Sequence, residues 1–327
     1  MTTKETILAA LTAAKGTAVS GAQMAERAGV SRAAVWKAIC ALRDEGYVID
    51  AVTRGGYTLH ADDGRLTAAA VAAHLHTDGL ALTALQSTDS TNTRIRALAE
   101  DGAPEGTVVV AAAQTAGRGR SGKSFLSPAG TGLYMSILLR PALTMGDSLL
   151  ITTAAAVAVS RAIERVAGCE AKIKWVNDVY VDEKKVCGIL TEGALDLETG
   201  GLQYAIVGIG VNCFPPEGGF PEDLPEAGSV FAERPQGIEG RSQLAGAILN
   251  YFFKFYPNLA QRPFFEDYRK RSLVLGKEIT VLEGTQTRTA LALDLDQDFS
   301  LRVREADGTE RTLSSGEVRV RPAKDRC

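Results

Sequence analysis

The glycine- and arginine-rich segment 114–124, QTAGRGRSGKS, restricts the fold of this chain more than any other stretch. An apolar run, residues 107–113, comes directly before it and is typical of a buried strand. Pro128 and two glycines follow closely and would break any helix that began there. Residues 133–141 are again strand-like and end at a proline. The sequence therefore predicts a strand, a long loop and a second strand.

The same loop has the chemistry of a phosphate-binding site. Glycine lets the backbone come close to a ligand, bare N–H groups bind oxyanions, and arginine binds them through two donors. Residues 117–124 also match the P-loop pattern G-x-x-x-x-G-K-[ST]. A P-loop must open a helix, and the sequence after this loop does not allow one. We predict a phosphate-binding loop of another kind, with a P-loop and a plain surface loop as the alternatives.

Composition places the chain among soluble globular proteins. It has 327 residues, of which 45% are hydrophobic and 23% charged, and this length predicts two or three domains. The five cysteines are scattered and odd in number, so we predict a reducing compartment, with no disulfide framework and no metal site. No stretch approaches the roughly 18 apolar residues of a membrane span, and the N-terminus lacks a signal-peptide core. We therefore predict a cytoplasmic protein that has no membrane partner.

The first 60 residues have the pattern of a winged helix-turn-helix. Helices are predicted over residues 4–14, 21–28 and 31–45, and two short strands around a glycine pair would form the wing. Seven Lys and Arg against five Asp and Glu leave an excess of only +2, which is small for a DNA-binding module. A protein-interaction module is the alternative, although DNA binding is favoured. The predicted DNA-contacting residues are Ser31, Arg32, Ala33, Lys37 and Arg54.

After residue 63 the pattern becomes a mixture of helices and strands. Paired glycines in a predicted strand, Gly208 and Gly210, indicate a close approach by a ligand or another chain. The last section holds five short strands separated by turns, which predicts a small SH3-like β-barrel. The main helices are predicted over residues 66–76, 93–100, 148–167, 240–255 and 263–270, and the main strands over 81–85, 171–175, 179–181, 186–190 and 204–212. The predicted domains are residues 1–63, 64–272 and 273–327.

Four polar clusters lie at the ends of predicted elements in the middle section: residues 90–92, Gln114 with its loop, residues 174–178, and Lys185. None forms a Ser-His-Asp triad, and the chain has only three histidines. Cationic, amide and backbone groups suit acyl activation by a nucleotide or phosphoryl transfer. Each cluster also has a plainer explanation, because Ser-Thr-Asn before a helix is commonly a cap and a hairpin lysine is commonly solvated.

Five motifs, taken in their order, resemble the biotin protein ligases of the bifunctional type, which also repress the biotin operon. They are residues 89–92 (DSTN), 114–120 (QTAGRGR), 174–178 (KWVND), 185–192 (KVCGILTE) and 208–212 (GIGVN). Segments 29–35 and 315–318 extend the resemblance over nearly the whole chain. It implies a multidomain α/β protein with an N-terminal winged helix-turn-helix, a central class II synthetase-like ligase domain with a mixed sheet, and a C-terminal SH3-like β-barrel.

The resemblance also implies a reaction and its partners. Biotin and ATP, with Mg²⁺, would give biotinyl-5′-AMP, and a lysine of the biotin carboxyl carrier domain of acetyl-CoA carboxylase or a related carboxylase would then take the biotinyl group. The adenylate would promote a homodimer, which binds operator DNA and represses the biotin genes. A small-molecule-sensing repressor without ligase activity and a P-loop ATPase with a helix-turn-helix are the alternative functions.

The family's site residues carry over to matching positions of this chain. Biotin would be bound by Ser90, Thr91, Asn92, Gln114, Arg118, Gly119, Arg120 and Lys185. ATP or the adenylate would contact Arg118, Arg120, Phe125, Asn177 and Asn212. The catalytic residues would be Lys185, Arg118, Arg120 and Asp178. Two departures stand out, because Phe125 replaces a common tryptophan that stacks on adenine and Val176 replaces a common proline.

Overall fold

The computed structural model describes residues 2–14, 17–44, 47, 49–52, 55–59, 66–144, 147–195, 201–233, 240–283, 286–314 and 317–320. The chain divides into two compact units: Met1–Arg65 with Pro235–Glu239, and Leu66–Arg234 with Gly240–Cys327. The three-domain division remains a prediction. Within the described residues, no helix combines the length and the apolar character needed to cross a membrane.

The first unit is a three-helix bundle with a two-stranded wing. Its helices are α1 (Thr3–Ala13), α2 (Gly21–Ala28) and α3 (Arg32–Asp44), and antiparallel strands β1 (Ile49–Val52) and β2 (Gly56–Leu59) form the wing. These elements match the predicted helices and strands. The core follows the predicted helical spacing and consists mainly of Ile7, Leu11, Met24, Val35, Ile39 and Leu42.

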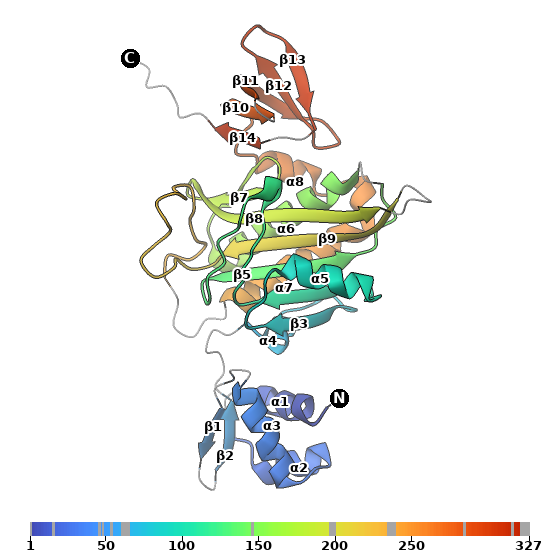
Figure 1. The fold of residues 1–327 in the computed structure, drawn as a ribbon, viewed down its shortest axis with the longest axis vertical. Coiled ribbons are helices and arrows are strands. Elements are labelled where there is room, and N and C mark those ends of the chain that lie inside the picture. The colour runs from blue at the N-terminus through green and yellow to red at the C-terminus, as the bar shows by residue number, and fades with distance from the viewer. Residues whose placement is uncertain are drawn as a thin grey trace. The chain divides into compact units, whose positions relative to one another are not determined.

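A seven-stranded mixed sheet forms the centre of the second unit, with the order β3-β4-β5-β9-β8-β7-β6 (Figure 1). Only β3 and β4 run parallel, and the other neighbours are antiparallel. The strands are β3 (Ala81–Leu85), β4 (Thr107–Ala111), β5 (Gly132–Leu139), β6 (Lys172–Lys174), β7 (Asp178–Val181), β8 (Lys184–Leu195) and β9 (Leu202–Asn212).

Helices cover the two faces of this sheet unequally. Helices α6 (Ser148–Ala167) and α7 (Gly240–Phe255) pack on one face, whereas α5 (Thr91–Glu100) packs on β4, β5 and β9 on the other (Figure 1). Side chains alternate along β4 accordingly. Val108 joins the large core that includes α6 and α7, and its neighbour Val109 joins the smaller core that includes α5.

The C-terminal part adds a five-stranded antiparallel sheet with the order β13-β12-β11-β10-β14. Phe299, from the turn before β12, packs against Phe264 and Tyr268 at ring-centroid distances of 5.4 Å and 5.2 Å. Its carbonyl accepts a hydrogen bond from Trp175 Nε1 at 2.9 Å, so the sheet is fastened to the central domain. The remaining elements are α4 (Ala68–Ala72), α8 (Phe265–Lys270), β10 (Glu278–Glu283), β11 (Gln286–Leu295), β12 (Leu301–Glu305), β13 (Glu310–Leu313) and β14 (Glu317–Val320).

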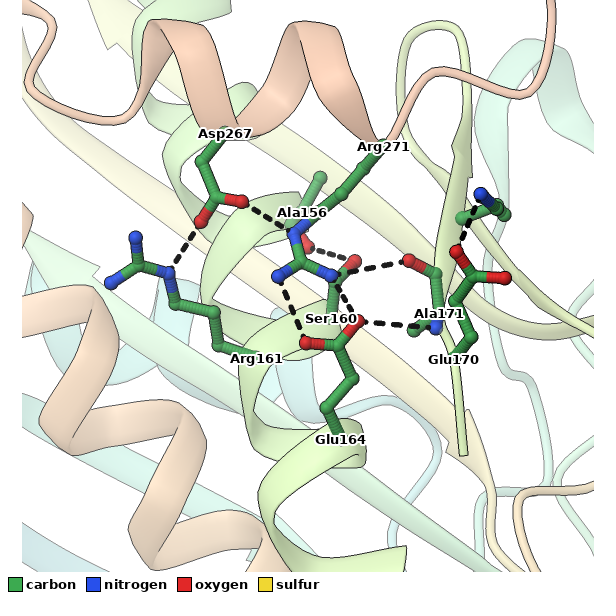
Figure 2. Close-up of polar contacts among 9 residues, drawn as sticks. Ala156, Ser160, Arg161, Glu164, Glu170, Ala171, Asp267 and Arg271 are labelled. Carbon is green, nitrogen blue, oxygen red and sulfur yellow. Dashed lines mark hydrogen bonds and ion pairs between the residues drawn. The ribbon is translucent and has the colours of Figure 1, made fainter. Parts of the chain in front are cut away.

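Ion pairs also join α6 to α8 and the residue that follows it, as Figure 2 shows. Arg271 donates to Asp267 at 2.7 Å and to Glu164 Oε2 at 2.9 Å, and Asp267 also binds Arg161. The Arg271 side chain is only 16% exposed, so this network is screened less than a surface pair. The network therefore holds α8, against which Phe299 packs, on α6.

Several predicted boundaries were wrong, and two of them bear on the site. The helix predicted from residue 93 begins at Thr91, so Thr91 and Asn92 belong to α5 itself. The helix predicted over 66–76 is shorter, Ala68–Ala72. The hairpin turn predicted over 182–185 contains only Asp182 and Glu183, which adopt left-handed conformations with φ of 46° and 61°. Lys185 consequently lies within strand β8.

Candidate active site

A strip of glycines lies on the sheet face that carries α5. A Cβ atom at Gly208 would lie 2.2 Å from Asn92 Oδ1, and one at Gly210 would lie 2.6 Å from the Phe125 ring. A Cβ atom at Gly188, on the neighbouring strand β8, would also contact that ring, at 3.2 Å. The close approach predicted for the paired glycines is therefore made by side chains of the chain itself. Because the glycines have no side chains, Asn92 and Phe125 can pack directly on the backbone of the sheet.

Buried hydrogen bonds connect the start of α5 to the loop that follows β4. Gln114 Oε1 accepts from the backbone N–H of Thr91 at 2.8 Å, and Gln114 Nε2 donates to Ser127 Oγ at 2.9 Å. Ser136 Oγ lies 2.7 Å from Thr91 Oγ1 and 2.6 Å from Asn92 Oδ1. The predicted residues Thr91, Asn92 and Gln114 thus come together, and sequence analysis missed Ser136, which no local motif distinguishes.

Ser90 occupies the N-cap position of α5, but its side chain makes no capping hydrogen bond. It is nevertheless only 3% exposed, in a place where a cap would normally face solvent. The cluster thus supplies the cap position of α5, but Ser90 does not cap the helix with its side chain.

Glu192 binds three donors, two from helix α5 and one from the loop after β4. Its carboxylate lies 2.6 Å from Asn92 Nδ2, 2.8 Å from Arg96 Nη2 and 2.8 Å from Arg118 Nη2. Arg118 is thereby fixed above the same face as Asn92. Sequence analysis assigned no role to Glu192, although it is the last residue of the fourth motif, and that position was the signal available.

Lys185 and Asp178 form an ion pair of 2.7 Å, Nζ to Oδ1, across strands β7 and β8. Their side chains are 33% and 20% exposed, so both can meet a ligand. A Cβ atom at Gly188 would lie 3.6 Å from Lys185 Cε, which places this pair beside the glycine strip and Phe125. The two predicted catalytic residues are therefore adjacent, and the ordered strand pair gives Lys185 a fixed direction.

The loop of residues 114–124 contains only a single 3₁₀ turn, Arg120–Gly122, before the chain continues to β5. The P-loop interpretation is therefore wrong. Gly119 N–H donates to the Lys123 carbonyl at 2.7 Å, so the loop closes on itself. Arg120 Nη1 donates to Asn177 Oδ1 at 2.9 Å, and Asn177 Nδ2 donates to the Ile189 carbonyl at 2.9 Å.

A cavity of about 360 Å³ opens beside Arg120 and Asn177. Turn residues next to β12 and β13 contribute to its wall, and its lining is rich in hydroxyl groups. The lining residues are Arg120, Ser148, Leu149, Thr152, Val176, Asn177, Ile189, Leu190, Thr191, Asp298, Ser300 and Ser314. Asn177 and Arg120 thus connect the loop with a space large enough for part of a nucleotide.

Phe125 and Asn212 lie at the other end of the glycine strip. The Phe125 ring packs edge-on against Tyr134 at a centroid distance of 6.4 Å, and burial raises the pKa of Tyr134 to about 12. Asn212 is two residues beyond Gly210 on β9, so its side chain shares that face. Asn212 Nδ2 donates to the Gly228 carbonyl at 3.0 Å, which fixes the loop over the strand end. Asn212 and Asn177 thus donate to different backbone carbonyls, those of Gly228 and Ile189.

In the first unit, the predicted DNA-contacting residues of α3 are exposed. Ser31 Oγ accepts from the Ala34 N–H at 3.2 Å and caps the helix, while Arg32, Ala33 and Lys37 face solvent. Arg54 lies outside the described residues. A further exposed side chain, Trp36, was not among the predicted contacts.

Fold and site together define a multidomain α/β ligase with an N-terminal helix-turn-helix. Family models match three consecutive parts: an HTH domain over residues 3–58, the Biotin/lipoate A/B protein ligase family over 84–212, and a Biotin protein ligase C terminal domain over 274–321. The chain belongs to the biotin protein ligase family, in the three-part form that begins with a helix-turn-helix.

Relatives of known activity cover almost the entire chain. The bifunctional ligase/repressor BirA of Bacillus subtilis is 34% identical over 305 residues, which are 91% of this chain and 92% of that protein. The Escherichia coli protein of the same name is 28% identical over 322 residues and 95% of both chains. A biotin protein ligase from Aquifex aeolicus, solved with biotin and ATP, has a TM-score of 0.59 and 30% identity over 74% of this chain and 98% of that one.

Proposed function

We propose that this protein joins biotin to a lysine of a biotin carboxyl carrier domain and, as a dimer, represses biotin genes. The observation that carries the ligase function is the assembly of all five sequence motifs on one sheet face, around the strip formed by Gly188, Gly208 and Gly210. A cytoplasmic location follows from the function, since ATP, the carrier domain and operator DNA are present there.

The first step joins two anions. A carboxylate oxygen of biotin attacks the α-phosphorus of ATP, a new P–O bond forms, and diphosphate leaves with the electrons of the broken P–O bond. Lys185 offsets the repulsion between carboxylate and phosphate, and Arg118 and Arg120 hold the phosphate from the loop above. Because these cations are fixed before the reaction, they stabilise charge as it develops.

The second step transfers the biotinyl group. The ε-amine of the acceptor lysine attacks the acyl carbon, AMP leaves, and the amine loses a proton. We assign the attraction of the incoming ammonium group and the acceptance of its proton to Asp178, whose carboxylate already binds Lys185 at 2.7 Å. Phe125 would cover the adenine, with Asn212 beside it and Asn177 toward the phosphates.

Biotin would bind at the start of α5. The proposed contacts for its ring and tail are Ser90, Thr91, Asn92, Gln114, Arg118, Gly119, Arg120 and Lys185. Magnesium would accompany ATP and neutralise phosphate charge. The described residues include no group of three or more His, Cys, Asp or Glu that could hold a metal, so the phosphates themselves would supply most of its ligands.

A homodimer is supported by the outer edge of β8. Beyond Ile189, β8 pairs with β9 on one side, and no other described strand pairs with its second side. Leu195, near the end of this edge, is 46% exposed. An unpaired edge can pair with the same edge of a second copy. Glu192 lies on this segment and binds Arg118. An adenylate that orders the loop of Arg118 would therefore also affect this strand edge.

Incubation with biotin, Mg·ATP and a carrier domain tests the ligase function. We expect mass spectrometry to find one biotinyl group on one carrier lysine, together with AMP and diphosphate. An unmodified carrier would contradict the ligase function and favour a repressor that only senses a small molecule. Sedimentation with and without biotin and ATP tests the dimer, and a gel shift with the biotin-gene promoter of the host tests repression.

A further inference from the structure

Trp36 presents an indole ring to solvent at the centre of α3. It is 56% exposed, and the other exposed large apolar side chains of the described residues are leucines: Leu126, Leu195 and Leu224. The opposite face of the helix is fully packed, because Val35, Ile39 and Leu42 are at most 1% exposed. Trp36 thus lies outside the buried core of the first unit, and its ring is available to a binding partner.

The surroundings of Trp36 indicate the chemistry of that partner. Arg32 lies one helical turn before it, Lys37 directly follows it, and Ala33 completes the exposed surface. The first turn of α3 contains no acidic residue. A cationic surface with an apolar centre fits a polyanion that also offers apolar groups. DNA has this combination in the major groove, where phosphates flank the 5-methyl groups of thymine.

The chemistry of the indole ring also restricts which DNA base Trp36 can recognise. The ring is a large apolar surface with a single N–H donor and no acceptor. It can pack on a thymine methyl group and donate to thymine O4 or a purine N7, but it cannot accept from the amino group of cytosine. Arg32 and Lys37 can bind phosphates or guanine, so the indole is the group suited to distinguish thymine.

We propose that Trp36 reads thymine methyl groups in the major groove of the operator. This inference rests on the proposed repressor function. Arg32 and Lys37 supply attraction that depends little on sequence, whereas Trp36 supplies preference for particular T·A pairs. The apolar packing is worth about 0.8 kcal/mol per buried methyl group, which is roughly a fourfold preference at each contacted thymine.

The full chain, with biotin and ATP, is first used to select its preferred duplex from random DNA. Each thymine of that duplex is then replaced by deoxyuridine, which removes only the methyl group, and affinity is measured by fluorescence anisotropy. We expect about fourfold weaker binding of the wild type at one or more thymines per half-site. In Trp36→Ala this thymine preference should disappear, whereas Lys37→Ala should bind both duplexes more weakly and keep the preference.

Binding of Trp36→Ala to non-specific duplex DNA, which Arg32 and Lys37 support, serves as the folding control of the first unit, and its affinity should equal that of the wild type. A wild type that binds the selected duplex equally well with thymine or deoxyuridine everywhere would overturn this inference and leave repression intact. A Trp36→Ala variant that keeps the thymine preference would do the same. If the wild type enriches no duplex at all, the repressor function itself fails, and the role of Trp36 fails with it.

Discussion

The two faces of the seven-stranded sheet differ in what they bury. On the α6 side, the contact is mainly apolar: Ile151, Ala155 and Val159 are completely buried, although the hydroxyls of Thr152 and Thr191 also meet there at 2.7 Å. On the α5 side, Ser136 is also completely buried, but its neighbours are the polar groups of Thr91 and Asn92. Buried polar groups cost stability unless they are paired, and apolar contacts of this density supply stability. The α6 face therefore stabilises the domain, whereas the α5 face can carry the functional groups of the site.

Lys185→Ala is the strongest test of this division, because it removes a cation from the polar face without touching either core. We expect adenylate formation to fall by about 100- to 1000-fold, the range found when one preorganised electrostatic group is deleted. ATP–diphosphate exchange measures this step alone. The melting temperature should change little, since Lys185 and its partner Asp178 are both partly exposed. Normal exchange would show that Lys185 is not part of the chemistry.

Ala155→Leu makes the converse change on the apolar face. Ala155 is completely buried in α6, so extra methyl groups must displace neighbours, and we expect a loss of about 1–3 kcal/mol in unfolding free energy. Urea denaturation measures this loss. The folded fraction should keep its KM for biotin. Arg165→Ala, at an exposed position of the same helix, is the control and should stay within about 0.5 kcal/mol of the wild type.

Gly208→Ala places one methyl group on the polar face. The new Cβ would lie 2.2 Å from Asn92 Oδ1, so Asn92 must move and lose its contacts with Ser136 and Glu192. We expect the KM for biotin to rise about tenfold, which corresponds to about one hydrogen bond of binding energy. In an Asn92→Ala background the same glycine substitution should have almost no further effect. Additive effects would mean that Gly208 acts in some other way.

Sequence patterns predicted those parts of the fold that depend on local periodicity. The helix over residues 148–167 has the predicted bounds, because its apolar pattern is long and Gly168 ends it in a left-handed conformation. The loop after β4 was placed correctly for a similar reason, since Pro128 excludes a helix. The motif residues of the candidate site were predicted from their order and resemblance, because single clusters could not have indicated them.

Contacts between distant segments were not predictable in this way. Glu192 meets Asn92 across 100 positions of sequence, and it does so only because β9 lies between β5 and β8. No local pattern encodes that strand order. The same holds for Phe125 above Gly210, where the sequence indicated close approach but not which group approaches. The boundaries of short polar segments were also predicted incorrectly. The turn at Asp182 is an example, because two residues in the left-handed conformation are enough for a hairpin.

Glu192→Gln is the mildest test of the polar face, because it removes a charge and keeps the shape. Arg96 and Arg118, the arginines that Glu192 binds, are 41% and 36% exposed, so each ion pair is worth at most about 1 kcal/mol. Arg118 would be held less firmly, and we expect the KM for biotin to rise about two- to fivefold.

Salt concentration separates this electrostatic effect from a loss of packing. Raising the ionic strength screens the wild-type ion pairs, so the difference between wild type and Glu192→Gln should shrink at about 1 M salt. Glu305→Gln is the matched control, because Glu305 also binds two arginines, Arg288 at 3.3 Å and Arg311 at 3.1 Å, but lies in the C-terminal sheet. It should leave the KM unchanged. If both variants alter the KM equally, the polar face depends on overall charge, and the position of Glu192 beside Arg118 has no special role.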